Sequence, residues 1–413
     1  MSKLQPVRGT HDLLPDDYRR FAHVVDTARD VARLYGYREM ATPIFEFTEL
    51  FARGIGEATD VVAKEMYTFG DRGGESLTLR PEYTAGICRA FISNGALAQR
   101  LPLKLFAAGP MFRYERPQKG RQRQFHQIDL EVLGAPEPAA DIEVISVAAD
   151  ILDRLAILER CVLKINSLGD PECRAVYRTV LVDYYSGHTA RLSEDSRERL
   201  QRNPLRILDS KDEGDIAINA NAPSFADHLN PASRDFFSAV KDGLSAAGIP
   251  FEVDTGLVRG LDYYTHTAFE FVTTHLGAQG TVIGGGRYDG LIAELGGPPT
   301  AGIGWAGGIE RLMMLCNEPA ALPRAVVIAP LGAAAEAKAL GIARTLRRAG
   351  IAVEQDYRGN MKRRMQRANK LNARAAIIIG DDELAKGVAQ VKDLDSGEQH
   401  EVALGKLVEA LKG

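Results

Sequence analysis

Two strand-like segments, residues 105–114 and 124–133, are joined through the stretch Phe112-Arg-Tyr-Glu-Arg-Pro-Gln-Lys-Gly-Arg-Gln-Arg-Gln-Phe-His-Gln127. Pro117 and Gly120 keep the connection out of regular structure, as in an antiparallel hairpin. Within eleven positions the connection carries five basic residues, opposed only by Glu115: Arg113, Arg116, Lys119, Arg121 and Arg123. Such a loop suits a polyphosphate or a nucleic-acid end, because the planar guanidinium of Arg holds phosphate oxygens bidentately. A solvated surface loop can carry the same charges, so the loop alone leaves both interpretations open.

Charge divides the rest of the chain. Residues 323–413 hold 16 Lys and Arg against 11 Asp and Glu, and the remaining residues hold 35 against 44. The change follows Asn317-Glu-Pro-Ala-Ala-Leu-Pro323, whose prolines and small residues are typical of a linker. Beyond it, strands expected at 325–329, 351–356 and 375–379 alternate with helices at 333–349 and 361–371. The sequence therefore predicts a first domain over residues 1–320 and a small α/β domain with a largely parallel sheet over 323–413.

Within the first domain, an amphipathic run over residues 18–35 predicts a helix, and residues 266–273 have the pattern of a further strand. Between about residues 168 and 230 the sequence becomes polar and rich in Arg and Asp, as in Arg191-Leu-Ser-Glu-Asp-Ser-Arg-Glu-Arg-Leu200. We expect a helical module inserted at this place.

Composition limits the class of protein. Of 413 residues, 45% are apolar and 26% are charged, values typical of soluble globular proteins. The net charge of -4 gives no overall attraction for nucleic acid or an anionic membrane, so such a partner must bind a local patch. The N-terminus has no apolar signal region, and no later stretch reaches the ~20 apolar residues of a membrane span. The four cysteines form no C-x-x-C pair. We therefore expect a cytoplasmic protein with reduced thiols and no membrane partner.

Two further segments contain residues that could bind a ligand. Leu257-Val-Arg-Gly-Leu-Asp-Tyr-Tyr-Thr265 places Arg259 and Asp262 in an otherwise apolar run, where charges need a ligand or each other as an ion pair. Ile283-Gly-Gly-Gly-Arg-Tyr-Asp-Gly290 allows a close backbone approach, with Arg287 and Tyr288 for polar contacts, although turns explain most glycine runs.

The segment Ala301-Gly-Ile-Gly-Trp-Ala-Gly-Gly-Ile-Glu-Arg-Leu312 predicts a glycine-rich strand that leads into a helix near Gly308. An Arg in the first turn of that helix can lie over a ligand whose phosphates face the helix N-terminus. The sequence has no G-x-x-x-x-G-K-[ST] loop, no H-E-x-x-H motif and no metal-spaced Cys/His cluster. A nucleotide would therefore be held in another way.

Together, these segments resemble the class II aminoacyl-tRNA synthetases, and specifically the histidyl-tRNA synthetase family. Residues 112–127 are similar to motif 2 of that class, residues 302–311 to motif 3, and Gly36-Tyr-Arg-Glu-Met-Ala-Thr-Pro43 to motif 1, which builds the dimer interface. The segments 257–265 and 284–289, with the opening Val7-Arg-Gly-Thr-His-Asp12, are similar to signatures of the histidyl family. The resemblance implies an α+β catalytic domain, with an antiparallel sheet flanked by helices and a helical insertion, followed by a C-terminal α/β anticodon-binding domain.

The resemblance also implies a two-step reaction. Histidine and ATP would form histidyl-adenylate and pyrophosphate, and the histidyl group would then pass to the terminal ribose of tRNA(His). Magnesium would bridge the phosphates, held mainly by ATP oxygens. The family pattern places Arg113 at the α-phosphate, Arg311 over the nucleotide, and Glu115 and Arg121 beside them in the ATP site. Arg259 would be a second catalytic cation at the reacting phosphate, in contact with histidine.

Histidine recognition requires groups for an ammonium and for an imidazole, because an apolar pocket rejects isosteres poorly. By resemblance, the backbone of the amino acid is bound by Glu82, Thr84 and Gln127. The imidazole side is bound by Glu131, Tyr263, Tyr264 and Tyr288. Glu131 could instead be an exposed strand carboxylate, and Tyr83 stands where family members often have glycine.

For tRNA, the resemblance makes Arg116, Gln118 and Arg123 contacts for the acceptor end. The helix in Arg358-Gly-Asn-Met-Lys-Arg-Arg-Met-Gln-Arg-Ala-Asn-Lys370 would meet the anticodon loop, although basic helices are often only solvated. A homodimer is implied by the family. The main rival is a catalytically inactive histidine-binding paralogue, such as the regulatory subunit of ATP phosphoribosyltransferase, which generally lacks the second domain and catalytic residues. A class II synthetase for another amino acid is the more distant alternative.

Overall fold

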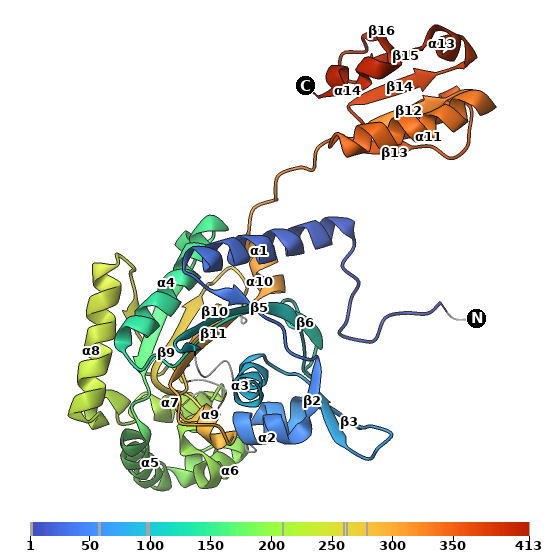
Figure 1. Ribbon diagram of the computed structural model, residues 1–413. Coiled ribbons are helices and arrows are strands. Elements are labelled where there is room, and N and C mark those ends of the chain that lie inside the picture. Colours follow the sequence, from blue (N-terminus) through green and yellow to red (C-terminus); the bar gives the residue numbers. More distant parts are fainter. Residues whose placement is uncertain are drawn as a thin grey trace. The chain divides into compact units, whose positions relative to one another are not determined.

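The computed structural model describes residues 3–56, 59–95, 100–208, 210–258, 261, 263–277 and 280–412. Contacts between residues divide the chain into two compact units, Met1–Pro319 (unit 1) and Ala320–Gly413 (unit 2), which are coloured along the sequence in Figure 1. Each unit has a hydrophobic core of its own.

Unit 1 is built on an eight-stranded sheet in the order β1-β5-β6-β11-β10-β9-β7-β8. Its strands are β1 (Arg38–Glu39), β5 (Leu103–Phe112), β6 (Gln124–Leu133), β7 (Val162–Ser167), β8 (Glu252–Val253), β9 (Thr265–Val272), β10 (Thr281–Arg287) and β11 (Gly302–Gly308). The six central strands pair antiparallel, and the short strands β1 and β8 pair parallel at the two edges. The expected antiparallel sheet is therefore confirmed.

The expected hairpin is formed by β5 and β6, which pair from Leu103↔Leu133 to Phe112↔Gln124. Side chains alternate between the faces of a strand, so the register sends two sets of β6 residues in opposite directions. Ile128, Leu130 and Val132 enter the main core, whereas Gln127, Asp129 and Glu131 face the other side.

One face of the sheet is covered by α1 (Pro15–Leu34), α4 (Pro138–Arg154), α8 (Pro231–Ala246) and α10 (Ile309–Leu315) (Figure 1). The first three helices begin with proline, whose fixed φ suits the first helical turn. Their apolar stripes pack on alternate residues of the strands and form the largest core.

The opposite face packs against α3 (Thr84–Ser93) and α9 (Leu291–Glu294). Next to them lie α2 (Thr48–Ile55), the π-helix η1 (Val61–Glu65) and a three-stranded sheet of β2 (Phe45–Phe47), β4 (Ser76–Leu79) and β3 (Tyr67–Gly70). This face holds fewer apolar side chains than the first, and buried tyrosines and carboxylates are among them.

Between β7 and α8 lies a helical segment with α5 (Pro171–Ser186), α6 (Glu194–Arg202) and α7 (Glu213–Asn219) and the short 3-10 turns η4 (Thr189–Arg191), η5 (Pro204–Ile207) and η6 (Phe225–His228). It has its own apolar cluster around Tyr177, Leu181 and Tyr185. The buried Asp215 joins its helices, because its carboxylate accepts hydrogen bonds from the hydroxyls of Ser193, Ser196 and Ser210 at 2.6–2.7 Å.

Unit 2 has a five-stranded sheet in the order β13-β12-β14-β15-β16. The strands are β12 (Val326–Pro330), β13 (Val353–Gln355), β14 (Ala375–Ile379), β15 (Val388–Asp393) and β16 (Gln399–Ala403), and the helices are α11 (Ala333–Arg348), α12 (Met361–Lys370), α13 (Asp381–Lys386) and α14 (Leu407–Leu411). Strands β13, β12 and β14 are parallel, as expected. Strands β15 and β16, which were not predicted from the sequence, pair antiparallel and form the other side of the sheet.

Candidate functional site

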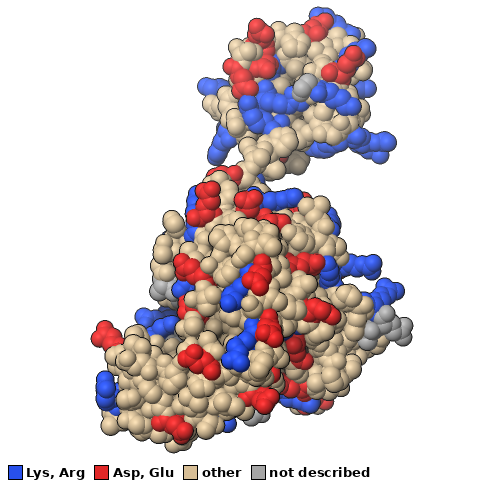
Figure 2. Space-filling view, turned by 90° about the vertical axis from the view of Figure 1, so that its left-hand side faces the viewer, with Lys and Arg blue, Asp and Glu red and all other residues tan. Residues whose placement is uncertain are grey.

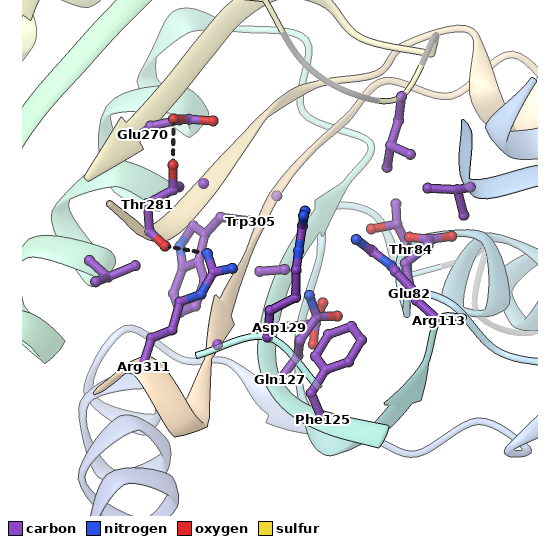
Figure 3. A pocket seen from close by; sticks show the side chains of 18 of the residues that line it. Glu82, Thr84, Arg113, Phe125, Gln127, Asp129, Glu270, Thr281, Trp305 and Arg311 are labelled. Atoms are coloured by element: carbon purple, nitrogen blue, oxygen red, sulfur yellow. Dashed lines mark hydrogen bonds between the residues drawn. The ribbon is translucent and has the colours of Figure 1, made fainter. Parts of the chain in front are cut away.

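A pocket of about 370 Å³ opens on the side of the unit 1 sheet that faces α3. Its lining comes from β6, β9, β10, β11 and the first turns of α3 and α10, together with the hairpin loop. Glu270, Thr281 and Arg311 lie toward one end, Glu82, Thr84 and Arg113 toward the other, and Gln127 and Asp129 between them (Figure 3). Ten of the residues expected in the site line this pocket: Glu82, Thr84, Arg113, Glu115, Arg121, Gln127, Tyr263, Tyr264, Tyr288 and Arg311.

Glu131 lies directly behind the lining and is not an exposed strand carboxylate, since only 1% of it is accessible. One of its oxygens accepts a hydrogen bond from Thr84 Oγ1 at 2.6 Å, and the other accepts from the hydroxyl of Tyr288. Gly304 makes room for it, because a Cβ at that position would overlap the carboxylate. Burial raises the pKa of Glu131 to about 8, against the opposing effect of the two hydroxyls.

Glu82 organises the start of α3. Its carboxylate oxygens accept hydrogen bonds from the backbone N–H groups of Thr84 and Ala85, both at 2.7 Å. Burial raises the pKa of Glu82, although these bonds favour the ionised form. Tyr83 fits this turn with its ring under the guanidinium of Arg80 and its hydroxyl donating to the carbonyl of Ala108 at 3.2 Å.

Three tyrosines form an aromatic wall. The ring centroids of Tyr263 and Tyr264 are 4.6 Å apart, and those of Tyr263 and Tyr288 are 5.7 Å apart. Burial raises the pKa of both Tyr263 and Tyr288, so their hydroxyls stay protonated and can donate. The wall therefore combines flat apolar surface with phenolic hydrogen-bonding groups.

The cationic part of the pocket consists of three arginines. Arg113 donates from Nε to the carbonyl of Pro81 at 2.9 Å, and Arg121 forms an ion pair with the buried Glu115. Arg311, in the first turn of α10, donates to the carbonyls of Gly120 (3.1 Å) and Thr281 (2.7 Å). Burial and the nearby Arg121 lower the pKa of Arg311, so an anion would relieve the repulsion between these cations.

Among the lining residues that were not expected in the site are Asp129, Glu270, Trp305 and Glu310. Asp129 lies between Gln127 and Glu131 on the same face of β6, and the alternation of polar and apolar residues from 127 to 132 was the signal that could have identified it. Glu310 binds the start of β6, because its carboxylate accepts from the backbone N–H of His126. No local pattern indicates that contact, which joins residues 184 positions apart.

The expected tRNA contacts Arg116, Gln118 and Arg123 lie in the hairpin connection and do not line the pocket. Arg123 packs over the ring of Tyr114 and donates from its backbone N–H to the carbonyl of Gly9 at 2.7 Å. The N-terminal segment therefore braces this connection. Arg259 and Asp262 lie outside the described residues, so the position of the second catalytic cation stays a prediction.

The role expected for Arg287 was wrong. Its side chain is fully buried away from the pocket, where Nε donates to Asp141 at 3.1 Å and Nη1 donates to Asp289 at 3.1 Å. The ion pair with Asp141 joins the end of β10 to α4 and holds the following residue, Tyr288, at the pocket. Arg287 is thus a structural cation beside the site.

Comparisons with known proteins agree with this arrangement. The family model described as histidyl-tRNA synthetase matches residues 9–240 and 232–312, and the model described as anticodon binding domain matches residues 325–413. A protein of Rhodospirillum rubrum named histidine-tRNA ligase is 60% identical over 412 residues, which cover 100% of this chain and 99% of that protein. A protein of Gluconacetobacter diazotrophicus with the same name is 57% identical over 413 residues, covering 100% and 99%.

Among solved structures, the apo histidyl-tRNA synthetase of Staphylococcus aureus is similar over 100% of both chains, with a TM-score of 0.84 and 36% identity. A second solved structure comes from Bacillus halodurans and is titled ATP phosphoribosyltransferase regulatory subunit/histidyl-tRNA synthetase. It has a TM-score of 0.68 and 22% identity, and the match covers 92% of this chain and 99% of that chain. At this identity the likeness shows only that the two chains have the same fold. Family model, full-length relatives and a full-length structural match agree with each other. The chain belongs to the histidyl-tRNA synthetase family.

Proposed function

We propose that this chain is a histidine-tRNA ligase, which forms histidyl-adenylate from histidine and ATP and transfers the histidyl group to the terminal ribose of tRNA(His). One observation carries the proposal: a single pocket brings three arginines together with buried carboxylates and tyrosines. The arginines suit a polyphosphate, and the second set suits an amino acid with a hydrogen-bonding ring. The full-length relatives named histidine-tRNA ligase support the same reaction.

For the first step, Arg113 binds the α-phosphate and Arg311 lies over the nucleotide. Arg121, held by Glu115, assists in the ATP site. Guanidinium groups stay charged at all physiological pH values, so these contacts do not depend on protonation. Their main effect is to position the carboxylate of histidine for in-line attack and to stabilise the charge that develops on the α-phosphate.

Arg259 supplies a further cation at the reacting phosphate and is the second residue that we assign to catalysis. Mg²⁺ neutralises charge on the ATP phosphates when it is bound. In the part of the chain that the structure describes, no group of three or more His, Cys, Asp and Glu side chains could hold a metal. We infer that ATP oxygens provide most of the ligands, in a pocket where the carboxylate of Glu270 accepts a hydrogen bond from the hydroxyl of Thr281.

For histidine, we assign the ammonium and carboxylate to Glu82, Thr84 and Gln127. The imidazole lies against Tyr263 and Tyr264 and contacts the Glu131–Tyr288 pair. We assign Arg259 as a further contact for histidine. A carboxylate and a phenol joined by a hydrogen bond can each bond a ring nitrogen. An isostere without ring nitrogens could not form hydrogen bonds with this buried pair, which accounts for the selection of histidine.

For tRNA, the acceptor end meets the exposed hairpin connection, where Arg116, Gln118 and Arg123 are the contacts. Unit 2 binds the anticodon loop through α12, which exposes Lys362, Arg363, Arg367 and Lys370 while it buries Arg364 and Ala368. Figure 2 shows Lys and Arg side chains gathered across the visible face of unit 2. A nucleic acid can bind such a local basic surface, although the chain as a whole has a net charge of -4.

We also propose a homodimer. The β2–β4–β3 sheet leaves three phenylalanines in solvent in the single chain, with exposed fractions of 53% for Phe45, 58% for Phe47 and 44% for Phe69. Aromatic side chains gathered on a sheet are typical of a surface that a second subunit covers. Sedimentation of the wild type and of Phe47→Asp tests this, since the variant should shift toward the monomer.

The protein's place of action is the cytoplasm, where tRNA is aminoacylated, and four free cysteines support a reducing compartment. Among the described residues, no helix has the length and apolar character needed to cross a membrane.

The deciding experiment is ATP/pyrophosphate exchange by the purified full chain with each amino acid in turn, followed by aminoacylation of tRNA. Exchange should occur with histidine alone. Arg113→Gln and Arg259→His should each lower exchange at least about 100-fold while histidine still binds. Arg154→Gln, at an exposed position of α4, is the matched control and should retain exchange.

Arg116→Gln separates the two steps, because it should retain exchange and lose aminoacylation. Histidine binding without exchange in the wild type would favour the inactive histidine-binding paralogue. Exchange with a different amino acid would favour another class II synthetase.

A further inference from the structure

The helical segment between β7 and α8 is attached to the rest of unit 1 at a junction where its two ends meet. Asp170, the N-cap of α5, accepts a hydrogen bond from the side-chain amide of Asn230 at 2.7 Å. The backbone N–H of Asn230 donates to Sγ of Cys173 at 3.1 Å. These contacts join residues about 60 positions apart, so the start of α5 is held against the return of the chain into α8.

The same junction holds the beginning of β9, which directly follows two tyrosines of the pocket. The backbone N–H of Leu168 donates to the carbonyl of His266 at 2.6 Å, and the N–H of His266 donates to the carbonyl of Gly169 at 2.7 Å. His266 has φ +46°, which residues other than glycine rarely adopt, and the pairing of β9 with β10 shifts register between Thr265 and Ala268. Such an irregularity persists only where its surroundings hold it, and the two hydrogen bonds to the junction do so.

Arg174, in the first turn of α5, extends this attachment to a residue of the pocket. Its Nη1 donates to the backbone carbonyl of Tyr264 at 2.9 Å, across 90 positions of the chain. A hydrogen bond from a charged donor is stronger than one between neutral groups. The helical segment therefore holds the backbone at Tyr264 by a contact that does not depend on the ligand in the pocket.

Tyr264 has space on the side that faces the helical segment. It lines the pocket and also a second cavity of about 40 Å³, whose other walls include Leu205 and Phe225. A side chain next to a void lacks packing contacts on that side and can shift into it. The polar contact with Arg174 opposes such a shift, because it fixes the backbone from which the ring projects.

We propose that Arg174 is a positioning residue for histidine binding, which holds Tyr264 where its ring contacts the imidazole. This inference rests on the proposed function, because it takes histidine as the ligand of that ring. Arg174 itself is not among the described residues that line the pocket, so it acts on histidine through Tyr264. The helical segment is then a part of the histidine site, since its first helix sets the position of one wall.

The test is a double-mutant cycle of Arg174→Met, which removes the donors, and Tyr264→Ala, which removes the ring and keeps the carbonyl. Calorimetry on the full chain measures the Kd for histidine of the wild type, both single variants and the double variant. Arg174→Met should raise the Kd about 10-fold, since a hydrogen bond from a charged donor is lost. In the Tyr264→Ala background the same change should alter the Kd by less than about twofold, because the ring that Arg174 positions is gone. Arg178→Met, one turn further along α5 at an exposed position, is the matched control and should leave the Kd unchanged.

An equal loss of affinity in both backgrounds would overturn the proposal, because Arg174 would then act without Tyr264. Unchanged affinity of the Arg174→Met variant would overturn it as well. In pyrophosphate exchange this variant should raise the KM for histidine and leave the KM for ATP unchanged, and a parallel rise in both would show a general disturbance and contradict the assigned role.

Thermal unfolding shows whether each variant is folded, and the same cycle can be run with Arg174→Gln if the methionine variant is not. Failure of the ligase function is distinguishable from failure of this inference. It would be seen as an absence of histidine-dependent exchange in the wild type, whereas the binding cycle needs no catalysis.

Discussion

Replacing Glu131 with glutamine should remove a pH-dependent loss of stability from unit 1. The pKa of this carboxyl rises from 4.5 to about 8 because the side chain is fully buried. Between those values the folded chain binds more protons than the unfolded chain, so the free energy of unfolding falls as the pH rises. Glutamine has nearly the same shape but does not titrate, and Thr84 and Tyr288 can turn their hydroxyls toward it.

The size of the effect follows from the two pKa values. At about 1.4 kcal/mol per pKa unit, the full shift corresponds to about 5 kcal/mol, and the part that falls between pH values of about 5.5 and 8.5 is about 3 kcal/mol. The difference in unfolding free energy, Glu131→Gln minus wild type, should therefore rise by about 3 kcal/mol across that interval.

Urea unfolding of the ligand-free protein at the two pH values measures this difference. Trp305 is the only tryptophan and belongs to the unit 1 core, so its fluorescence reports on this unit. Glu159→Gln, at an exposed position, controls for the loss of a carboxyl group. A difference that stays constant with pH, or that shrinks as the pH rises, would refute the assignment of Glu131 as a carboxyl kept neutral by burial.

Arg311→Lys should raise the KM for ATP at least about 10-fold in pyrophosphate exchange, because lysine cannot make both carbonyl contacts and also cover a base. Histidine affinity measured by calorimetry should not change, and a parallel loss there would contradict the role. Asp215→Ala leaves three serine hydroxyls without an acceptor and should destabilise the helical segment by about 2–4 kcal/mol, seen as faster hydrogen exchange in α5 to α7. Exchange rates equal to wild type would show that the carboxylate does not hold the segment together. Gly9→Val should reduce tRNA aminoacylation more than pyrophosphate exchange, since Gly9 has φ +85° and a Cβ there would lie 2.8 Å from Cγ of Arg123. An equal loss in both assays would instead indicate a general disturbance of the site.

Much of the site could be predicted because it is encoded in local patterns. The hairpin requires only two alternating strands and a connection with Pro and Gly, and these are contiguous in the chain. The same period of two carries Gln127, Asp129 and Glu131 to one face of β6, so applying it between the two predicted residues Gln127 and Glu131 would have found Asp129. In unit 2, β16 was missed because its five residues are mostly polar and exposed, and β15 was missed although Val388, Ala389 and Val391 are apolar.

The sequence by itself determined the family, the antiparallel hairpin and the residue types that a phosphate and an imidazole require, because each of these depends on short contiguous patterns. Only the tertiary structure decided which partner each charged side chain has and whether that side chain lies in the pocket. Glu131 meets Tyr288 across 157 positions, Arg287 meets Asp141 across 146, and Thr84 meets Glu131 across 47. The pKa of a buried carboxyl and the partner of a buried arginine are set by such distant neighbours, since desolvation and hydrogen bonding depend on which groups surround a side chain in space.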